Sequence, residues 1–325
     1  MKNILFITAT RLGDAVLSAG LLSAILAQNP DAAITVVCGP IPAPLFRAVP
    51  GVKRIIEMKK QPFARHWWQM WRQCIGTKWD LVVDLRRSFA AQLLRGKYIA
   101  LPYAQLGEHK VQHYARTLKL NPPSAPRVWL DEIARASAAA ALPARKKYFA
   151  VGATANWRGK TWPPEMFIHL IQELTKPEAI FADYTPVIFG APDEENQAAP
   201  IISTFRNFVV NAVGKFDPLT TAAALQRCAF CIGNDSGLMH LAAASGVPTL
   251  GLFGPSHAEI YGPWGPHCAY VRTEKSYKEL TSARGYNHRT TGTLMESLPV
   301  EKVITAAQTL WQTVQQQART QGAAA

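Results

Sequence analysis

The chain has 325 residues, 48% of them hydrophobic, and its 35 Lys and Arg outnumber its 22 Asp and Glu by 13. This length predicts two folded domains, each able to bury its own core. Five scattered cysteines favour reduced thiols over a disulfide framework, the apolar start at Ile4–Ala9 is too short for a signal peptide, and no run of about 18 apolar residues would span a membrane. We therefore expect a cytoplasmic protein.

The positive charge belongs to one half of the chain. Residues 1–147 carry 22 Lys and Arg against 8 Asp and Glu, a net +14, whereas residues 148–325 carry 13 against 14, a net −1. A field of one sign indicates an anionic partner for the first half, namely nucleic acid, an anionic membrane surface or a phosphorylated glycolipid, unless the charge serves solubility alone.

Strand-like and helical patterns alternate in the first half of the chain, and the pattern restarts after Pro143. This alternation predicts two parallel sheets, each wound by helices on both faces. The strands expected first are 3–8, 33–38, 54–57, 81–85 and 98–101, with helices at 15–28, 63–75 and 110–118. The second set has strands at 148–152, 186–190, 208–211, 230–234 and 249–253, and helices at 163–175, 194–205, 219–227 and 238–244. A final amphipathic helix is expected at 300–314, followed by a weakly structured tail, 315–325.

Ligands of such sheets bind beyond the carboxyl ends of the strands, so the loop after each first strand is a candidate site. In the first half this loop is Thr8–Asp14, and its single Gly13 does not make a dinucleotide fingerprint. Asp14 could remove a proton from an incoming hydroxyl or simply cap the following helix. Arg11 could hold an anionic acceptor or be one more solvated charge.

The corresponding loop of the second half, Gly152–Pro164, concentrates polar donors. Thr154, Arg158 and Lys160 could bind a diphosphate through charge-assisted hydrogen bonds. The segment could equally be a basic surface loop without a ligand. In the next loop, Gly190–Glu195, a carboxylate could accept hydrogen bonds from a ribose or could favour a helix start.

The segment Gly233–Pro255, GNDSGLMHLAAASGVPTLGLFGP, is predicted to end a strand, turn and begin a helix. The free N–H groups at such a helix start attract anions. Asp235 and Ser236 are also ordinary N-cap residues, so a capped structural helix remains an alternative. Cys228 and Cys231 form a single CxxC spacing in an apolar run, and no metal site is predicted.

Five motifs in this order resemble glycosyltransferase family 9, the lipopolysaccharide heptosyltransferases. They are LGD at 12–14, GKTWP at 159–163, GAPDEE at 190–195, GNDSGLMHLAAA at 233–244 and LFGPS at 252–256. The resemblance covers essentially the whole chain. It implies a GT-B fold of two Rossmann-like domains facing a central cleft, with an acceptor-binding domain at 1–145 and a nucleotide-sugar domain at 146–325. The C-terminal helix is expected to pack back on the first of these domains.

The resemblance also implies an inverting transfer, without metal or other cofactor, of a heptose from an ADP-sugar to an anionic glycolipid, the inner-core acceptor of lipopolysaccharide. Asp14 takes the role of general base, and Arg11 and Gly13 lie at the acceptor. Lys160 and Thr154 would bind the diphosphate, Asp235 the sugar hydroxyls, and Glu194, with Glu195 as competitor, the ribose. The phosphate end would be lined by Ser236, Gly237, Leu238 and His240, although His240 could equally be a core histidine.

Tryptophans and arginines are mixed at 63–72, which suits the headgroup region of a bilayer. We expect a peripheral contact with the inner face of the inner membrane, unless Trp67 and Trp71 pack inward and only the arginines meet water. Two other functions stay open: the same mechanism with another nucleotide sugar, and a non-catalytic protein that binds anionic lipid or nucleic acid. No motif of a nucleic-acid module is present, so nucleic acid is not an expected partner.

Overall fold

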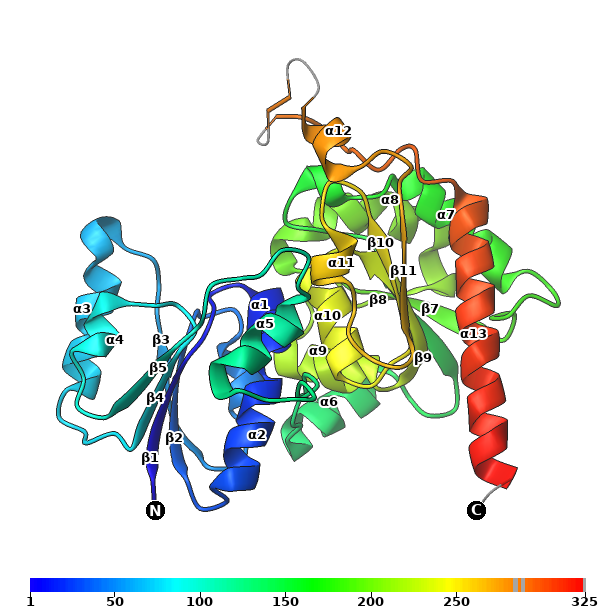
Figure 1. Cartoon of the computed structure of the whole chain (residues 1–325). Coiled ribbons are helices and arrows are strands. Elements are labelled where there is room, and N and C mark those ends of the chain that lie inside the picture. The colour runs from blue at the N-terminus through cyan, green and yellow to red at the C-terminus, as the bar shows by residue number, and fades with distance from the viewer. Residues whose placement is uncertain (283–285, 288–289, 324–325) are drawn as a thin grey trace. The chain divides into compact units, whose positions relative to one another are not determined.

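The computed structural model describes residues 1–282, 286–287 and 290–323. Its contacts divide the chain into two compact units, Met1–Glu132 and Ile133–Ala325. Each unit contains one parallel sheet covered by helices (Figure 1). The functional division into an acceptor domain at 1–145 and a donor domain at 146–325 stays a prediction.

The sheet of the first unit has the strand order β3-β2-β1-β4-β5, with every neighbouring pair parallel. Its strands are β1 (Asn3–Ile7), β2 (Ala33–Cys38), β3 (Val52–Glu57), β4 (Leu81–Asp84) and β5 (Lys97–Ala100). The central strand β1, NILFI, is almost wholly buried, because helices cover both faces of the sheet.

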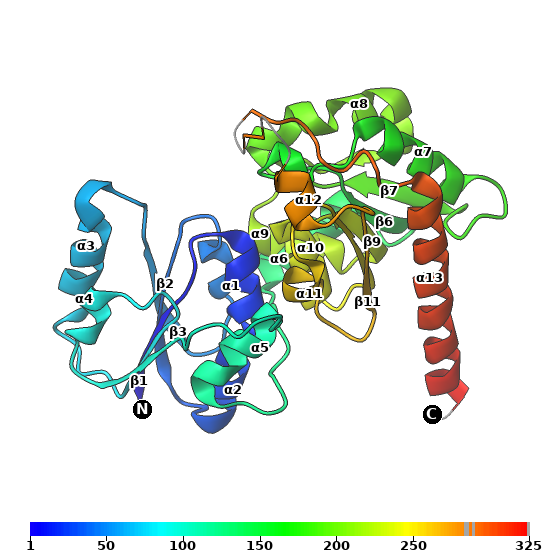
Figure 2. The same ribbon diagram turned by 45° about the horizontal axis from the view of Figure 1, so that its top comes forward.

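Helices α3 (Arg65–Cys74) and α4 (Phe89–Gln92) lie on one face of this sheet, and α1 (Leu12–Ser18), α2 (Gly20–Gln28) and α5 (Lys110–Ala115) lie on the other (Figure 2). Short 3-10 turns complete the unit at Ala43–Phe46, Pro62–Ala64 and Arg116–Leu118. The single helix expected at 15–28 is two helices that begin at Leu12. At their junction the Ala19 amide donates to the Val16 carbonyl, a three-residue step that interrupts the α-helical pattern.

The second unit has a six-stranded parallel sheet of order β11-β10-β9-β6-β7-β8. Its strands are β6 (Lys147–Gly152), β7 (Tyr184–Ile188), β8 (Val210–Asn211), β9 (Cys228–Asn234), β10 (Thr249–Phe253) and β11 (Cys268–Arg272). Its helices are α6 (Glu132–Ala141), α7 (Pro164–Thr175), α8 (Glu195–Phe205), α9 (Pro218–Leu225), α10 (Gly237–Ala244), α11 (Ala258–Tyr261), α12 (Tyr277–Thr281) and α13 (Val300–Ala323). Further 3-10 turns are Arg158–Lys160, Pro192–Glu194 and Arg206–Phe208.

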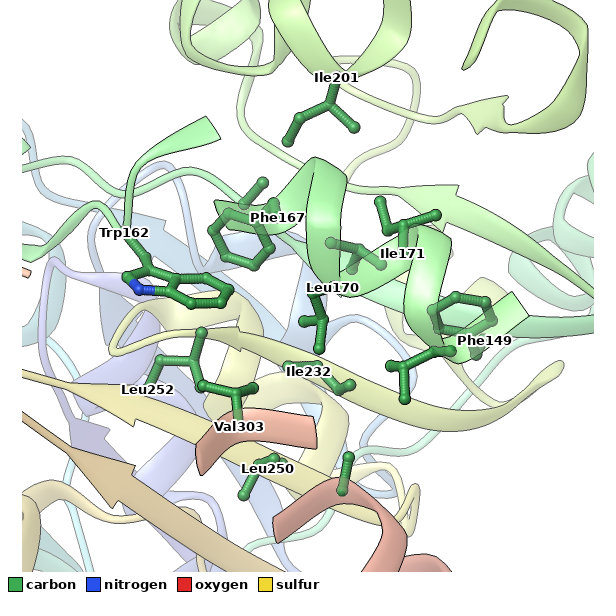
Figure 3. Packing of buried hydrophobic residues seen from close by; sticks show 14 of the residues in the cluster. Phe149, Trp162, Phe167, Leu170, Ile171, Ile201, Ile232, Leu250, Leu252 and Val303 are labelled. Carbon is green, nitrogen blue, oxygen red and sulfur yellow. The ribbon is translucent and has the colours of Figure 1, made fainter. Parts of the chain in front are cut away.

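The core of the second unit forms where α7, α8 and α13 cover the sheet. Leu170 of α7 points toward the buried strand residues Ile232 and Leu250, and Phe167 and Ile171 of the same helix and Val303 of α13 belong to the same buried cluster (Figure 3). Trp162, two residues before α7, is fully buried against Phe167, with ring centroids 4.9 Å apart in an edge-to-face arrangement. The apolar i, i+3, i+4 spacing of α7 thus places its apolar side chains on one side of the helix, which covers one face of the sheet.

The C-terminal helix differs from its prediction. The tail expected to be weakly structured continues α13 as far as Ala323, while 324 and 325 lie outside the described residues. Gln, Ala and Arg, which favour helices, dominate this stretch. The helix packs on α7, β10 and β11 of its own unit, and its expected return to the first domain stays a prediction. Strand β11, CAYVR, was not expected: its apolar run is limited to Cys268–Val271, and as the edge strand of the sheet it is only partly buried.

Candidate donor and acceptor sites

Each sheet has one point at which its strand order reverses. In the second unit the chain runs outward from β6 through β7 to β8, and then returns to the other side of β6 with β9. In the first unit the same reversal separates β1 from β4. Ligands of open parallel sheets bind in the crevice at the carboxyl ends of the strands that flank such a point. The fold therefore singles out the loops after β6 and β9, and those after β1 and β4.

The two loops at the reversal of the second sheet meet through an ion pair. Lys160, from the loop after β6, donates to Asp235, from the end of β9, with 2.5 Å between Nζ and Oδ2. The Asp235 side chain is only 5% exposed, whereas that of Lys160 is 25% exposed. His240 of α10 lies on the other carboxylate oxygen, with Nε2 3.9 Å from Oδ1. Two residues predicted for the donor site, Lys160 and His240, thus converge on the buried carboxylate of a third, Asp235.

Helix α10 begins beside this pair. Ser236 is its N-cap residue, yet the Ser236 side chain makes no capping hydrogen bond. Asp235 is not the cap either, because its carboxylate is engaged by Lys160. Ser236 and Gly237 are partly exposed, so the helix start presents its N–H groups and positive dipole end at the surface of the reversal point. Such a terminus suits an anion such as phosphate.

Glycines let the two central strands approach closely at this edge. A Cβ built on Gly233 would lie 3.0 Å from both Cα and O of Gly152, the residue paired with it on β6. A Cβ on Gly152 would lie 2.9 Å from Cδ2 of Leu238. The side chain of Leu238 therefore packs over the end of β6, so its contribution to an anion site would be its backbone N–H.

A second polar contact joins the loops after β6 and β7. The Thr154 hydroxyl donates to Oε2 of Glu194 over 2.6 Å, and the Ala191 amide donates to the same oxygen over 3.0 Å. Gly190 permits the contact, since a Cβ there would lie 2.8 Å from Thr154 Oγ1. Glu194 is partly exposed and Glu195 is exposed, as the first residue of α8. Glu194 is thus the carboxylate that the fold fixes beside Thr154.

Three side chains that the sequence did not single out hold the Lys160 loop in place. Gln197 of α8 accepts from the Ala155 amide and the Thr161 hydroxyl, and its own amide donates to the Ala155 carbonyl. The buried Asn234 accepts from the Trp162 amide over 3.1 Å. The Thr293 hydroxyl donates to the Thr161 carbonyl over 2.5 Å. These bonds bridge 36 to 132 positions of sequence, so no local motif could reveal them.

In the first unit, Asp14 lies in the first turn of α1, after the carboxyl end of β1. The N-cap residue is Arg11, whose side chain makes no capping bond, so the alternative in which Asp14 caps a helix beginning at Ala15 is wrong. Asp14 is partly exposed, and no hydrogen bond or ion pair engages its carboxylate within the described part of the chain. Arg11 is exposed and Gly13 partly exposed on the same turn.

The Asp14 loop is held by two tight contacts. The Thr8 and Ser18 hydroxyls are buried and 2.7 Å apart, which ties the end of β1 to α1. After β2, Gly39 passes so close to the loop that a Cβ on it would lie 2.6 Å from Thr10 Cα. A side chain at position 39 would displace the loop that carries Asp14.

Neither unit offers a metal cluster in the residues that the structure describes: no group of three or more His, Cys, Asp or Glu is placed to hold a metal ion. Across the same residues, none of the helices combines the length and apolar character needed to cross a membrane.

Known proteins resemble the chain in sequence and in fold. At the sequence level, lipooligosaccharide heptosyltransferase 2 of Haemophilus influenzae is 30% identical over 119 residues, which is 35% of this chain and 32% of that protein. The chain thus matches about a third of the length of this curated relative. The crystal structure of a family 9 glycosyltransferase from Veillonella parvula superposes with a TM-score of 0.80 at 24% identity, covering 96% of this chain and 98% of that one.

The E. coli heptosyltransferase WaaC, in a structure with ADP-2-deoxy-2-fluoro heptose, superposes with a TM-score of 0.68 at 19% identity, covering 94% of this chain and 99% of that one. These likenesses confirm the predicted fold class, α/β with two Rossmann-like parallel sheets of the GT-B type. The profile of glycosyltransferase family 9 (heptosyltransferase) matches residues 97–287, which is more than half of the chain. The chain therefore belongs to glycosyltransferase family 9.

Proposed function

We propose that this protein transfers a heptose, or a closely related sugar, from an ADP-sugar to a lipopolysaccharide inner-core acceptor, with inversion and without a metal. The observation that carries the proposal is the Lys160–Asp235 pair beside the open start of α10, at the strand-order reversal of the second sheet. Membership of family 9 and the ADP-sugar in the WaaC structure support the donor class. An anionic glycolipid acceptor agrees with the first unit, whose 18 Lys and Arg exceed its 8 Asp and Glu.

In the proposed mechanism the donor diphosphate binds at the start of α10, where N–H groups of Gly237 and Leu238 are available, and Lys160 neutralises its charge. Lys160 then shares its proton donors between phosphate and Asp235, which frees oxygen lone pairs of Asp235 for sugar hydroxyls. As the glycosidic bond to phosphate breaks, Lys160 stabilises the negative charge that develops on the leaving ADP. His240 and Ser236 add donors around it. The Thr154 hydroxyl, which donates to Glu194 in the structure, turns to the diphosphate, and the Glu194 oxygen that it releases accepts from the ribose.

Asp14 is the proposed general base. Its carboxylate is partly exposed and is engaged by no other group of the described residues, so it can accept the proton of an acceptor hydroxyl as the oxygen attacks the anomeric carbon. Arg11 on the same turn would pair with an anionic group of the acceptor. This function places the protein in the cytoplasm, in peripheral contact with the inner face of the inner membrane.

The test is release of ADP from ADP-heptose in the presence of a lipid A–Kdo acceptor, measured for the wild type, Asp14→Asn and Asp31→Asn. Asp31 is an exposed carboxylate at the opposite edge of the first sheet, so it is a matched control. We expect kcat to fall at least about 100-fold in Asp14→Asn and to be unchanged in Asp31→Asn. Full transfer by Asp14→Asn would refute the base assignment. A parallel binding screen of nucleotide sugars tests the donor, and tighter binding of a donor that lacks ADP would favour the same mechanism with another sugar nucleotide.

A further inference from the structure

The outer face of α3 is unusual for a surface helix. Its inward positions, Trp67, Met70, Trp71 and Cys74, pack against the first-unit core, as the alternative to a membrane contact expected for Trp67 and Trp71. The other part of that alternative, in which only the arginines meet water, is wrong, because Trp68 is exposed. The outward positions Arg65, Trp68 and Arg72 follow at i, i+3 and i+7 and are all exposed. Trp68 is 50% exposed, so the arginines share their face with an aromatic ring.

Further apolar side chains are exposed around this face. Phe63, in the turn that leads into α3, is 95% exposed, and it is held there by left-handed backbone at both Phe63 and Ala64. Helix α4 packs beside α3, as Figures 1 and 2 both show, and exposes Phe89 and Leu93 by 68% and 45%. Exposed apolar groups gathered in this way mark an interaction surface.

The two segments of the chain that contain α3 and α4 carry charge of one sign. Residues 58–79 and 85–107, which include α3 and α4, contain nine Lys and Arg and no Asp or Glu. Both segments leave the sheet at the carboxyl ends of β3 and β4, the edge that also carries Asp14. Cations in the same segments as exposed apolar and aromatic side chains fit the anionic headgroups and the outer acyl region of a bilayer. Leu93 favours lipid over nucleic acid, because an aliphatic side chain can enter the acyl region but cannot stack on a base.

We infer that the face formed by Phe63, α3 and α4 docks on the surface of an anionic phospholipid bilayer. Phe63, Trp68, Phe89 and Leu93 enter the headgroup region, and Arg65 and Arg72 pair with lipid phosphates. The inference rests on the proposed function in one respect, because it names the surface by which the enzyme meets a lipid-linked acceptor. Its residues are distinct from Asp14 and from the donor site.

The experiment measures co-sedimentation of the full chain with vesicles of phosphatidylcholine alone and of phosphatidylcholine mixed with phosphatidylglycerol, at low and high salt and without substrates. We expect binding to the mixed vesicles only. Phe63→Ser/Phe89→Ser should weaken the partition coefficient at least about tenfold at either salt. Arg65→Gln/Arg72→Gln should weaken it about 30-fold at low salt and far less at high salt, where the charges are screened.

Matched controls lie on the second unit. Phe208→Ser removes an aromatic side chain that is 44% exposed, and Arg145→Gln/Lys146→Gln removes two exposed charges without changing the patch. Both controls should bind vesicles like the wild type. Circular dichroism should show that all variants are folded, because each substituted side chain points to solvent. Quenching of Trp68 fluorescence by brominated lipid, which Trp68→Phe should largely remove, gives a readout of insertion independent of sedimentation.

Unchanged vesicle binding in both patch variants would overturn the inference, as would equal binding to neutral vesicles. Tighter binding to a single-stranded oligonucleotide than to the mixed vesicles, lost in Arg65→Gln/Arg72→Gln, would assign the face to nucleic acid instead. The proposed function fails separately. Patch variants should keep wild-type affinity for ADP, whereas a chain that binds vesicles but neither ADP nor an ADP-sugar would contradict the transferase proposal and leave the docking surface standing.

Discussion

Replacing Lys160 by Met removes the cation that holds Asp235 and keeps most of the aliphatic length. The pair is 2.5 Å long, and Asp235 is 5% exposed. Breaking a buried pair costs about 3 to 5 kcal/mol; Lys160 is 25% exposed, so we expect the free energy of unfolding to fall by about 2 kcal/mol. Loss of one charge-assisted hydrogen bond to the diphosphate should also weaken ADP binding by about 1.5 to 3 kcal/mol, roughly 10- to 150-fold.

Titration calorimetry with ADP and urea unfolding measure the two effects. Lys176→Met is the matched control, because Lys176 pairs with Glu173 over 2.6 Å on the surface, with side chains 57% and 34% exposed. Lys176 follows α7, about 18 Å of helix away from the Lys160 loop. We expect this control to lose less than about 1 kcal/mol of stability and none of its ADP affinity.

Adding Asp235→Asn to Lys160→Met should restore part of the lost stability, because it removes the unpaired buried charge. Wild-type ADP affinity in Lys160→Met would show that the pair is structural only and would refute its assignment to the diphosphate.

Three further predictions concern the supports of the two sites and the buried His113 of α5 in the first unit. Gln197→Ala should raise the KM for the nucleotide sugar several-fold with a smaller change in kcat, because it frees the Lys160 loop, while Gln226→Ala, which removes an exposed bond to Ser245, should not; steady-state kinetics decides. Gly39→Ala should lower the unfolding free energy by about 1 to 3 kcal/mol and reduce kcat, since its Cβ would meet Thr10, whereas Gly76→Ala meets nothing and should be neutral in thermal unfolding and transfer assays. The third concerns pH. Burial lowers the pKa of His113. Burial alone would raise the pKa of Glu108, but hydrogen bonds from Arg116 and the Gln105 amide outweigh this effect, so the pKa of Glu108 is lowered as well. Both folded pKa values lie below the unfolded ones, so the stability that these groups contribute should be complete above about pH 6.5 and should decline as pH falls through the folded values. In His113→Gln, the urea midpoint should depend less on pH near pH 6 than in the wild type. An unaltered pH profile in this variant would contradict the role given to His113.

Much of the fold was predictable because its signals are local. The apolar run ITVVC predicts its strand from its own composition, and the predicted strands 33–38 and 249–253 match β2 and β10 at both ends. The membership of family 9, suggested by five short motifs in order, is confirmed. The misjudged elements include the break between α1 and α2 and the helices α4, α6, α11 and α12, which were not expected. Two others, β11 and the end of α13, lack a long apolar signal, and tertiary contacts or helix propensity decide them instead.

The candidate site was likewise predictable only where its signals are local. The sequence indicated Asp14, Lys160 and Asp235 one motif at a time, and the roles of all the predicted site residues stay predictions. It could not show that Lys160 reaches Asp235 across 75 positions, or that Gln197 and Thr293 brace the loop between them. Nor could it show which tryptophan of α3 faces water.

By itself, the sequence determined most of the strands, the family and the residue types at each strand end, because those follow from neighbouring residues along the chain. Only the tertiary structure decided that β9 returns to lie beside β6, since strand order depends on how distant segments pack. That return brings the Lys160 loop onto the Asp235 carboxylate and excludes most of the water around it. The ion pair is therefore a property of the fold rather than of either motif.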